Sequence, residues 1–178
     1  MSLYQRPPAH THVICVDEMG PTAVKTYAAA RWRETRPQVE ADYGRRGKVW
    51  TFGAFEPRTG RALTSCVDGR TSANFLVFLD QIVATWEGEL VLILDNLSIH
   101  KTLDVLLWAL AHPQVHFLFQ PTYAPWLNLI EPWWKSLRSL ALKGRRFETT
   151  EEITQAIADA TDYWNHHRKP YVWRKAVA

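Results

Sequence analysis

Cysteines and long hydrophobic runs are scarce in this 178-residue chain. The apolar runs, such as the one within residues 89–95, are far shorter than the roughly 20 residues that a membrane-spanning helix needs. Residues 1–11 lack the apolar core of a secretory signal, so we expect a soluble, cytoplasmic protein without a membrane partner. Cys15 and Cys66 lie in separate apolar runs, and we expect buried, reduced thiols there rather than a disulfide or a metal site.

Glycine and proline are limited to eight and ten residues, which excludes a collagen-like or linker-like chain. Hydrophobic residues make up 47% of the chain and charged residues 22%, the balance of a packed globular protein. A domain of this length buries roughly 70% of its unfolded surface, so it needs no disulfide or structural zinc. The net charge of +3 and the pI near 9.0 allow an anionic partner without requiring one.

The placement of positive charge is more informative than its total. Residues 135–146 contain five basic side chains and no acidic one: Lys135, Arg138, Lys143, Arg145 and Arg146. Nine tryptophans are many for this length, and Trp126, Trp133 and Trp134 lie beside this basic segment. Because cations neutralise phosphates and aromatic rings stack on bases, the basic residues and Trp133 are predicted to bind nucleic acid.

Periodicity and turn residues predict the order of the secondary structure. Apolar runs predict strands at residues 13–16, 48–55, 61–67, 89–94 and 115–119. Apolar residues at helical spacing predict helices at 72–86, 102–111 and 131–142, and a last helix that opens at Thr149 with a capping box to Glu152. Residues 22–46 have weak periodicity and are predicted to be loop with irregular helix.

This order predicts an α/β fold, a mixed five-stranded sheet flanked by helices. The five-residue link at 56–60 makes the second and third strands an antiparallel hairpin. Helical crossovers make the later strands parallel to the first, and ligands of such sheets bind beyond the carboxyl ends of the strands. The residues that end the two most apolar strands are therefore the first candidates for a site.

Asp17 and Asp95 end these two strands. An ionised acid that follows a buried strand must be paired, hydrogen-bonded or bound to a cation. Taken singly, each aspartate is better explained as a turn former or a helix cap, and it is the conjunction of the acids that favours a site. No fixed basic neighbour of either aspartate is evident in the sequence, so a cation is a reasonable partner. Glu18 is a weaker candidate, because adjacent strand residues point to opposite faces.

Glu131 precedes Pro132 and fits the first turn of the predicted basic helix. Glu131, Lys135 and Arg138 fall at i, i+4 and i+7, on one helical face. A solvated face of salt bridges is one interpretation; the other places the carboxylate at metal ions and the two cations along a phosphate backbone. Three carboxylates at one end of the sheet would form a strongly negative pocket that suits Mg²⁺ or Mn²⁺.

Three segments carry a family resemblance: VDE at 16–18, LILDNLSIHK at 92–101 and PTYAPWLNLIEPWWKSLR at 121–138. They resemble the DDE catalytic domain of mariner-type transposases, in the branch found in bacterial insertion sequences. The 35 residues between Asp95 and Glu131 fit the short spacing of that superfamily. The resemblance implies a ribonuclease-H-like fold in which Asp17, Asp95 and Glu131 hold two Mg²⁺ ions, with Mn²⁺ able to substitute. Asn96, His100 and Asn128 match frequent neighbours of those acids, although His100 is equally explained as a residue at a helix N-terminus.

The resemblance also implies an activity, that of a metal-dependent DNA transposase. Such an enzyme cleaves the phosphodiesters at transposon ends and joins the freed 3′ ends to target DNA, here with insertion expected at TA. Two ions about 4 Å apart relieve the charge on the attacking and leaving oxygens. We expect double-stranded DNA as the partner and a homodimer in the active complex. Alternatives are a nuclease or resolvase of the same fold that does not join strands, a domesticated remnant that only binds DNA, and a scaffold for self-association.

The expected organisation is an N-terminal extension at 1–12, the catalytic domain at 13–170 and a C-terminal tail at 171–178. Members of the superfamily normally carry helix-turn-helix modules before the first catalytic strand. Only about a dozen residues precede that strand here, so we expect recognition of transposon ends to require another segment or a separate protein.

Overall fold

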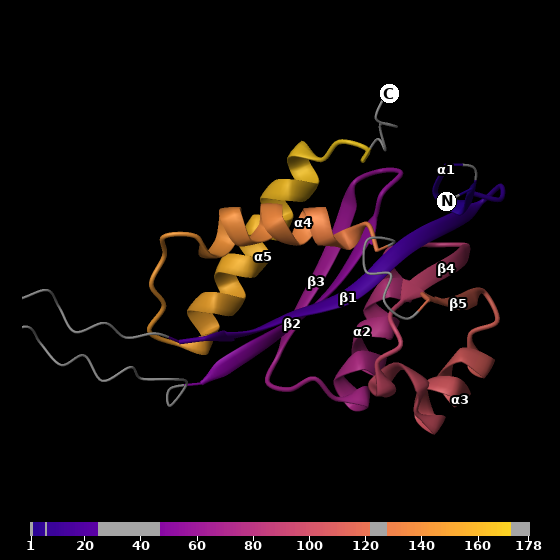
Figure 1. Cartoon of the computed structure of the whole chain (residues 1–178), viewed down its shortest axis with the longest axis horizontal. Coiled ribbons are helices and arrows are strands. Elements are labelled where there is room, and N and C mark those ends of the chain that lie inside the picture. The colour runs from indigo at the N-terminus through magenta and orange to yellow at the C-terminus, as the bar shows by residue number, and fades with distance from the viewer. Residues whose placement is uncertain (1, 6, 25–46, 122–127, 172–178) are drawn as a thin grey trace, which may run out of the picture.

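Five strands form one mixed sheet in the order β3-β2-β1-β4-β5 (Figure 1). The computed structural model describes residues 2–5, 7–24, 47–121 and 128–171. The strands are β1 (Thr11–Ala23), β2 (Lys48–Glu56), β3 (Arg61–Val67), β4 (Glu89–Leu94) and β5 (Val115–Phe119). β2 pairs antiparallel with β1 and β3, whereas β4 pairs parallel with β1 and β5. The predicted mixed five-stranded sheet and its hairpin are confirmed.

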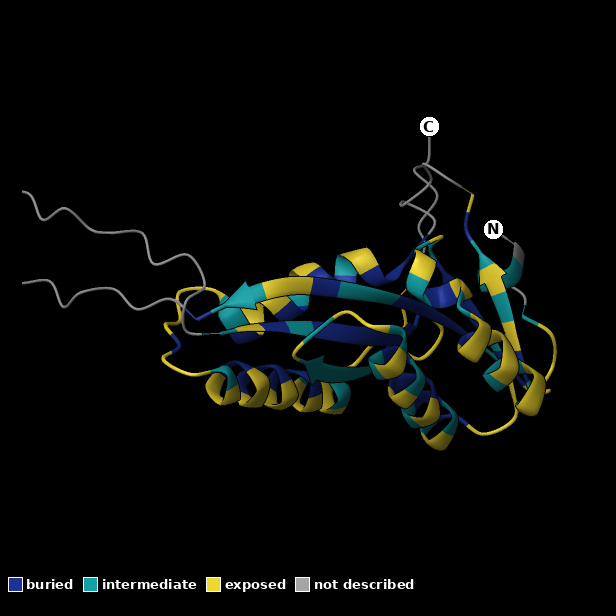
Figure 2. Ribbon diagram, turned by 90° about the horizontal axis from the view of Figure 1, so that it is seen from below, coloured by how far each residue is buried: buried dark blue, intermediate teal, exposed yellow. Residues whose placement is uncertain are grey.

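Helices cover both faces of the sheet. They are α1 (Ser2–Gln5), α2 (Ser72–Thr85), the 3₁₀ turn η1 (Ser98–Lys101), α3 (Leu103–Ala111), α4 (Ile130–Leu137), the π-helical turn η3 (Arg138–Leu142) and α5 (Thr150–His167). One core lies between the sheet and α4, η3 and α5, and a second lies between the sheet and α2 and α3. The helices turn their buried residues toward the sheet and their exposed residues outward (Figure 2).

Alternation along β1 assigns its side chains to the two cores. Cys15 and Met19 pack with α4 and α5, and Ile14 and Val16 pack with α2 and α3. By the same alternation Asp17 faces the α4 side and Glu18 the α2 side. Cys15 and Cys66 are free thiols, the first buried and the second half-buried.

The first strand is longer than predicted, and the prediction that it ends at Asp17 is wrong. Its pairing with β2 continues to Ala23, across an irregularity in register between Met19 and Thr22. Gly20, with φ 132°, and Pro21 lie inside that irregularity. A bulge tolerates a proline because the ladder needs no N–H donor there. Only the parallel pairing with β4 stops before Asp17.

The remaining predicted elements are confirmed with small shifts. The Thr149 hydroxyl accepts a hydrogen bond from the Glu152 N–H and so begins α5 as predicted, although the Glu152 carboxylate accepts from the Glu148 N–H instead of closing the box on Thr149. Of the predicted loop at 22–46, residues 22–23 belong to β1 and residues 25–46 lie outside the described residues. None of the helices in the described residues is long and apolar enough to cross a membrane.

Candidate active site

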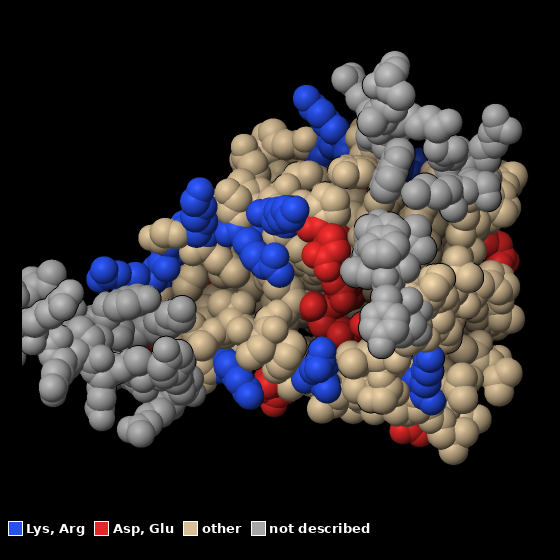
Figure 3. Space-filling view, viewed as in Figure 1, with Lys and Arg blue, Asp and Glu red and all other residues tan. Residues whose placement is uncertain are grey.

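The parallel pairing of β1 with β4 brings Asp17 level with Asp95. The register pairs Thr11 with Glu89 and continues without a shift to Cys15 and Ile93. Continuing this register by two residues would place the backbone of Asp17 beside that of Asp95, the residue directly after β4. Acidic side chains gather in the middle of this face of the molecule, with basic side chains around them (Figure 3).

Asp17 is held against α4 by a tryptophan. The Trp134 Nε1–H donates to Asp17 Oδ2 at 3.0 Å. Burial, with smaller contributions from the negative charges of Glu18 and Glu131, raises the pKa of the Asp17 carboxyl to about 7. Glu131 itself is exposed in the first turn of α4. An ionised Asp17 is therefore costly here unless a cation accompanies it.

Asp95 lies against His100, one of the neighbours that the family resemblance names, so the expectation that Asp95 has no fixed basic neighbour is wrong. His100 Nδ1 is 3.0 Å from Asp95 Oδ1, and His100 Nε2 is 2.7 Å from Glu18 Oε1. The hydrogen bond from His100 lowers the pKa of Asp95. Burial acts to lower the pKa of His100, but its hydrogen bonds to the two carboxylates outweigh burial and raise that pKa to about 9. A buried ionic chain thus links Glu18 to Asp95.

The two candidate asparagines have different surroundings. The buried Asn128 donates to the carbonyl of Val16 at 3.2 Å, and its Oδ1 accepts from the Ile130 N–H at 3.4 Å. It thereby ties the start of α4 to β1 beside Asp17. Asn96 is exposed, and its Oδ1 accepts from Lys101 Nζ at 2.6 Å. Its amide donates to the carbonyl of Gln120, so its hydrogen bonds go to neither aspartate.

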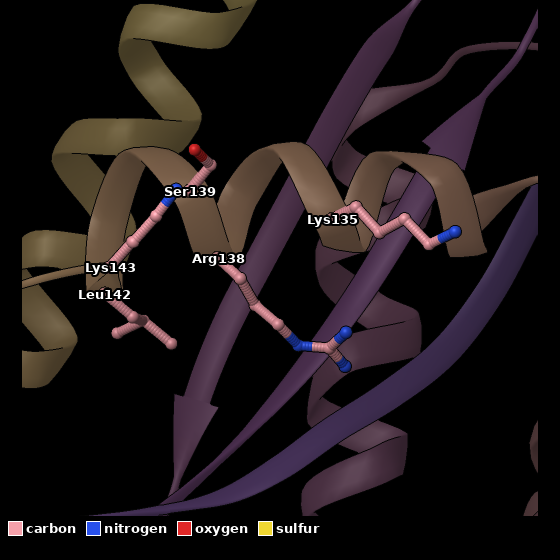
Figure 4. A pocket seen from close by; sticks show the side chains of 5 residues that line it. All are labelled: Lys135, Arg138, Ser139, Leu142 and Lys143. Carbon is pink, nitrogen blue, oxygen red and sulfur yellow. The ribbon is translucent and has the colours of Figure 1, made fainter.

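The basic segment forms an open surface next to the acids. Lys135, Arg138 and Lys143, with Ser139 and Leu142, line an open pocket of about 490 Å³ (Figure 4). The Lys135 and Arg138 side chains extend toward the N-terminal end of α4, the end that carries Glu131. Arg145 and Arg146 are exposed on the segment that follows, and Arg145 lies over the Phe147 ring. The described residues give Glu131 and Lys135 no ion pair with each other.

Trp133 does not belong to this surface, and the prediction that it stacks on nucleic acid bases is wrong. Its side chain is 2% exposed and stacks on Phe55, with 5.9 Å between ring centroids. Ile130, Trp133, Trp134 and Leu137 form the buried stripe of α4. Their spacing of i, i+3, i+4 and i+7 is that of a helix face turned to the core, a signal that the sequence contains. Trp126 lies outside the described residues.

Trp133→Ala is expected to lower the free energy of unfolding by about 3–5 kcal/mol, because it empties a large buried volume. Urea denaturation measures this loss. Normal stability combined with weaker DNA binding would contradict the core assignment and restore the role in base stacking.

Arg70 and Gly53 also lie near the acids. Arg70 lies over the Trp50 ring, 4.8 Å from its centroid, and its guanidinium is 3.9 Å from Glu18 Oε2. Gly53 pairs with Asp17 across β1 and β2, and a Cβ at this glycine would overlap the Trp134 ring. Neither residue belongs to a sequence motif, since each is recognisable only from its neighbours across the sheet.

The donor chemistry of the three acids fits a hard divalent cation. Carboxylate oxygens are the ligands that Mg²⁺ and Mn²⁺ take. Burial raises the pKa of Asp17, so a nearby cation would favour its ionised form. The described part of the chain contains no group of three or more His, Cys, Asp or Glu side chains already drawn together to hold a metal. Asp17 instead bonds to Trp134, and Asp95 contacts His100.

The fold is that of a ribonuclease-H-like catalytic core. The catalytic core domain of BIV integrase aligns with a TM-score of 0.60, over 89% of this chain and 86% of that one, at 12% sequence identity. Residues 12–154 match the family described as DDE superfamily endonuclease, and this chain belongs to that family.

A curated relative comes from a mobile element. A Shigella sonnei protein, the insertion element IS630 uncharacterized 39 kDa protein, is 28% identical over 137 residues. The match covers 68% of this chain and 39% of the relative, so the chain spans less than half of that protein's length.

Proposed function

We propose that this chain is the catalytic domain of a metal-dependent DNA transposase. It cleaves phosphodiesters at the ends of an insertion element and joins the resulting 3′ ends to target DNA, with insertion at TA. The active complex is a homodimer on double-stranded DNA in the bacterial cytoplasm. Separate residues or a partner protein recognise the element's ends. The observation that supports the proposal is the parallel pairing of β1, which contains Asp17, with β4, which ends directly before Asp95, together with the hydrogen bond from Trp134 of α4, the helix that bears Glu131, to Asp17.

Asp17, Asp95 and Glu131 would hold two Mg²⁺ or Mn²⁺ ions. When bound, such ions relieve the charge that develops on the attacking and leaving oxygens of a phosphodiester. The protein's own contribution is to position the ligands: Trp134 orients Asp17, and Asn128 ties the start of α4 to β1. The negative charge of Asp17 is unfavourable in the free protein, and a bound cation would stabilise it.

Cleavage and joining are the same displacement with different nucleophiles. In cleavage, a water oxygen bonds to phosphorus, the bond from phosphorus to the 3′ oxygen breaks, and that oxygen takes up a proton. In joining, the freed 3′ hydroxyl oxygen attacks a target phosphate, displaces the target's own 3′ oxygen and gives up its proton. The number of phosphodiester bonds is conserved in joining, so no further energy source is needed.

Lys135 and Arg138 would contact the DNA backbone beside the acids. Replacing either with alanine is expected to weaken DNA binding, and each change should reduce the slope of log K against log salt by about one if the residue meets one phosphate. Fluorescence anisotropy across a range of salt concentrations measures both effects. Arg58→Ala is a matched control, since Arg58 is an exposed cation in the turn between β2 and β3. An equal loss in the control would contradict a local contact.

Two assays on the purified chain test the activity itself. Nicking of supercoiled plasmid should require Mg²⁺ or Mn²⁺ and stop with EDTA. A pre-cut transposon end with a free 3′ hydroxyl should become joined to target DNA. Nicking without joining would favour the nuclease alternative, and DNA binding without nicking would favour the domesticated remnant. Either outcome overturns the transposase assignment for this chain.

A further inference from the structure

His100 is fixed between two acids, Glu18 of β1 and Asp95, which directly follows β4. Its side chain is fully buried, with Nε2 2.7 Å from Glu18 Oε1 and Nδ1 3.0 Å from Asp95 Oδ1. The Glu18 side chain is only 2% exposed. The Phe75 ring packs against the imidazole, with 4.4 Å between centroids. The ring therefore has little freedom to turn away from either carboxylate.

Asp95 is held through one of its two oxygens. Oδ1 accepts from the Leu97 N–H at 2.9 Å and faces the imidazole of His100. In residues 2–5, 7–24, 47–121 and 128–171, no hydrogen bond or ion pair reaches Oδ2. The Asp95 side chain is 47% exposed. The contacts fix the carboxylate and leave one oxygen unengaged.

We propose that Glu18 and His100 are positioning residues for metal binding: Glu18 orients the imidazole, and the imidazole holds Asp95 Oδ1 so that Oδ2 is presented to the divalent ion. This inference rests on the proposed function. It makes Glu18 a residue that supports the metal ligands and is not a ligand itself, because its oxygens face His100 and Arg70 on the α2 side of the sheet. Partners of this kind typically contribute about 10–100-fold to metal affinity.

A positioning role and simple electrostatics predict opposite changes in metal affinity when His100 is replaced. A cationic imidazole repels a divalent ion, so removing it should tighten metal binding if charge alone matters. If His100 orients Asp95, removing it should weaken binding instead. Glu18→Asp makes the complementary test, because it keeps the negative charge and shortens the side chain, so that the hydrogen bond to Nε2 is broken.

Isothermal titration calorimetry with Mn²⁺ on the whole chain decides between these effects. Glu18→Asp and His100→Gln should each bind Mn²⁺ about tenfold or more weakly than wild type. The double variant should lose little beyond either single change, because both residues act through the same contact to Asp95. Circular dichroism and metal-free thermal unfolding establish that each variant is folded. Glu18→Asp keeps the test intact if His100→Gln does not fold.

Glu56→Asp is the matched control for a buried glutamate paired with a histidine. The Glu56 side chain is 4% exposed and lies 2.8 Å from His12 Nδ1. It is the last residue of β2, away from Asp95 along the sheet. Shortening it should lower thermal stability as Glu18→Asp does, while Mn²⁺ affinity stays at the wild-type value.

Two results would overturn the inference alone: wild-type or tighter Mn²⁺ affinity in folded Glu18→Asp or His100→Gln, or additive losses in the double variant, which would make Glu18 an independent ligand. Failure of the proposed function looks different. In that case wild type binds no Mn²⁺, or binds it equally well after Asp17→Asn and Glu131→Gln.

Discussion

Asp95→Asn is expected to reduce Mn²⁺-dependent nicking by on the order of 10⁴-fold, to the background of the assay. The amide keeps the shape of the carboxylate but lacks its charge, so it cannot offset the charge of a divalent ion. Asp17→Asn and Glu131→Gln should have the same effect, because the proposed site needs all three acids. Quantified conversion of supercoiled to nicked plasmid measures the loss.

Metal-free stability separates this explanation from a structural role of the acids. The folded-state pKa of Asp17, about 7, lies above its ordinary value, so its ionised form destabilises the fold as the pH rises toward and past 7. Asparagine does not ionise, and Asp17→Asn in EDTA at pH 8 should therefore unfold at the same temperature as wild type or higher. A large drop in melting temperature would instead identify Asp17 as a structural residue.

Glu87→Gln is the control for a general loss of negative charge. Glu87 is exposed and precedes β4, at the end of that strand opposite to Asp95. Its replacement should leave nicking unchanged. If it reduced nicking as strongly as Asp95→Asn, overall charge and not the placement of three acids would explain the activity.

Gly53→Ala is expected to cost about 1–3 kcal/mol of stability and to reduce cleavage as well. Gly53 lies in the middle strand of the β3-β2-β1 half of the sheet, hydrogen-bonded on both sides, so its backbone cannot move aside. A Cβ there would overlap the Trp134 ring and approach Trp133 to 3.2 Å. The Trp134 ring must then shift away from Asp17, and misplacement by about 1 Å can cost 10²-fold in rate.

A second substitution separates the loss of stability in Gly53→Ala from its loss of cleavage. The Cβ at position 53 would meet the six-membered ring of Trp134, and Trp134→Phe removes the ring atoms that it would meet. Gly53→Ala with Trp134→Phe should regain stability but not cleavage, because phenylalanine has no N–H to donate to Asp17. Gly69→Ala is the control, since its Cβ would meet only Thr71 Cγ2 at 3.6 Å. Full activity in Gly53→Ala would show that the contact between Trp134 and Asp17 is dispensable.

Some features of the fold could be read from the chain because they depend on local patterns. The continuous apolar run of β4 predicts a strand covered on both faces, and the spacing of α2 and α5 predicts their buried faces. The parallel pairing of β1 with β4 follows from the helical crossover between them. The length of β1 did not follow, because Gly20 and Pro21 indicate a turn unless the bulge opposite β2 is known.

The tryptophans of α4 show how two signals in one segment compete. A basic segment beside aromatic residues indicates nucleic acid binding, and the exposed Lys135 and Arg138 agree with that interpretation. The helical spacing of Trp133 and Trp134 indicates a core face, and the structure follows the spacing. Burial decides because packing in the core removes far more of the apolar surface of these rings from water than a DNA-facing surface would.

The sheet, the hairpin and the family could be predicted from the amino-acid order, since strand and helix periodicity and short motifs are local features of the chain. How side chains support the acids is evident only in the folded chain: the resemblance named His100 and Asn128 as neighbours of the acids, but neither the bond from His100 to Glu18 nor that from Trp134 to Asp17. The bond from His100 to Glu18 joins residues 82 positions apart, and that from Trp134 to Asp17 joins residues 117 apart. Such partners depend on the register of two strands and the seating of one helix, and both arise only when the two cores pack.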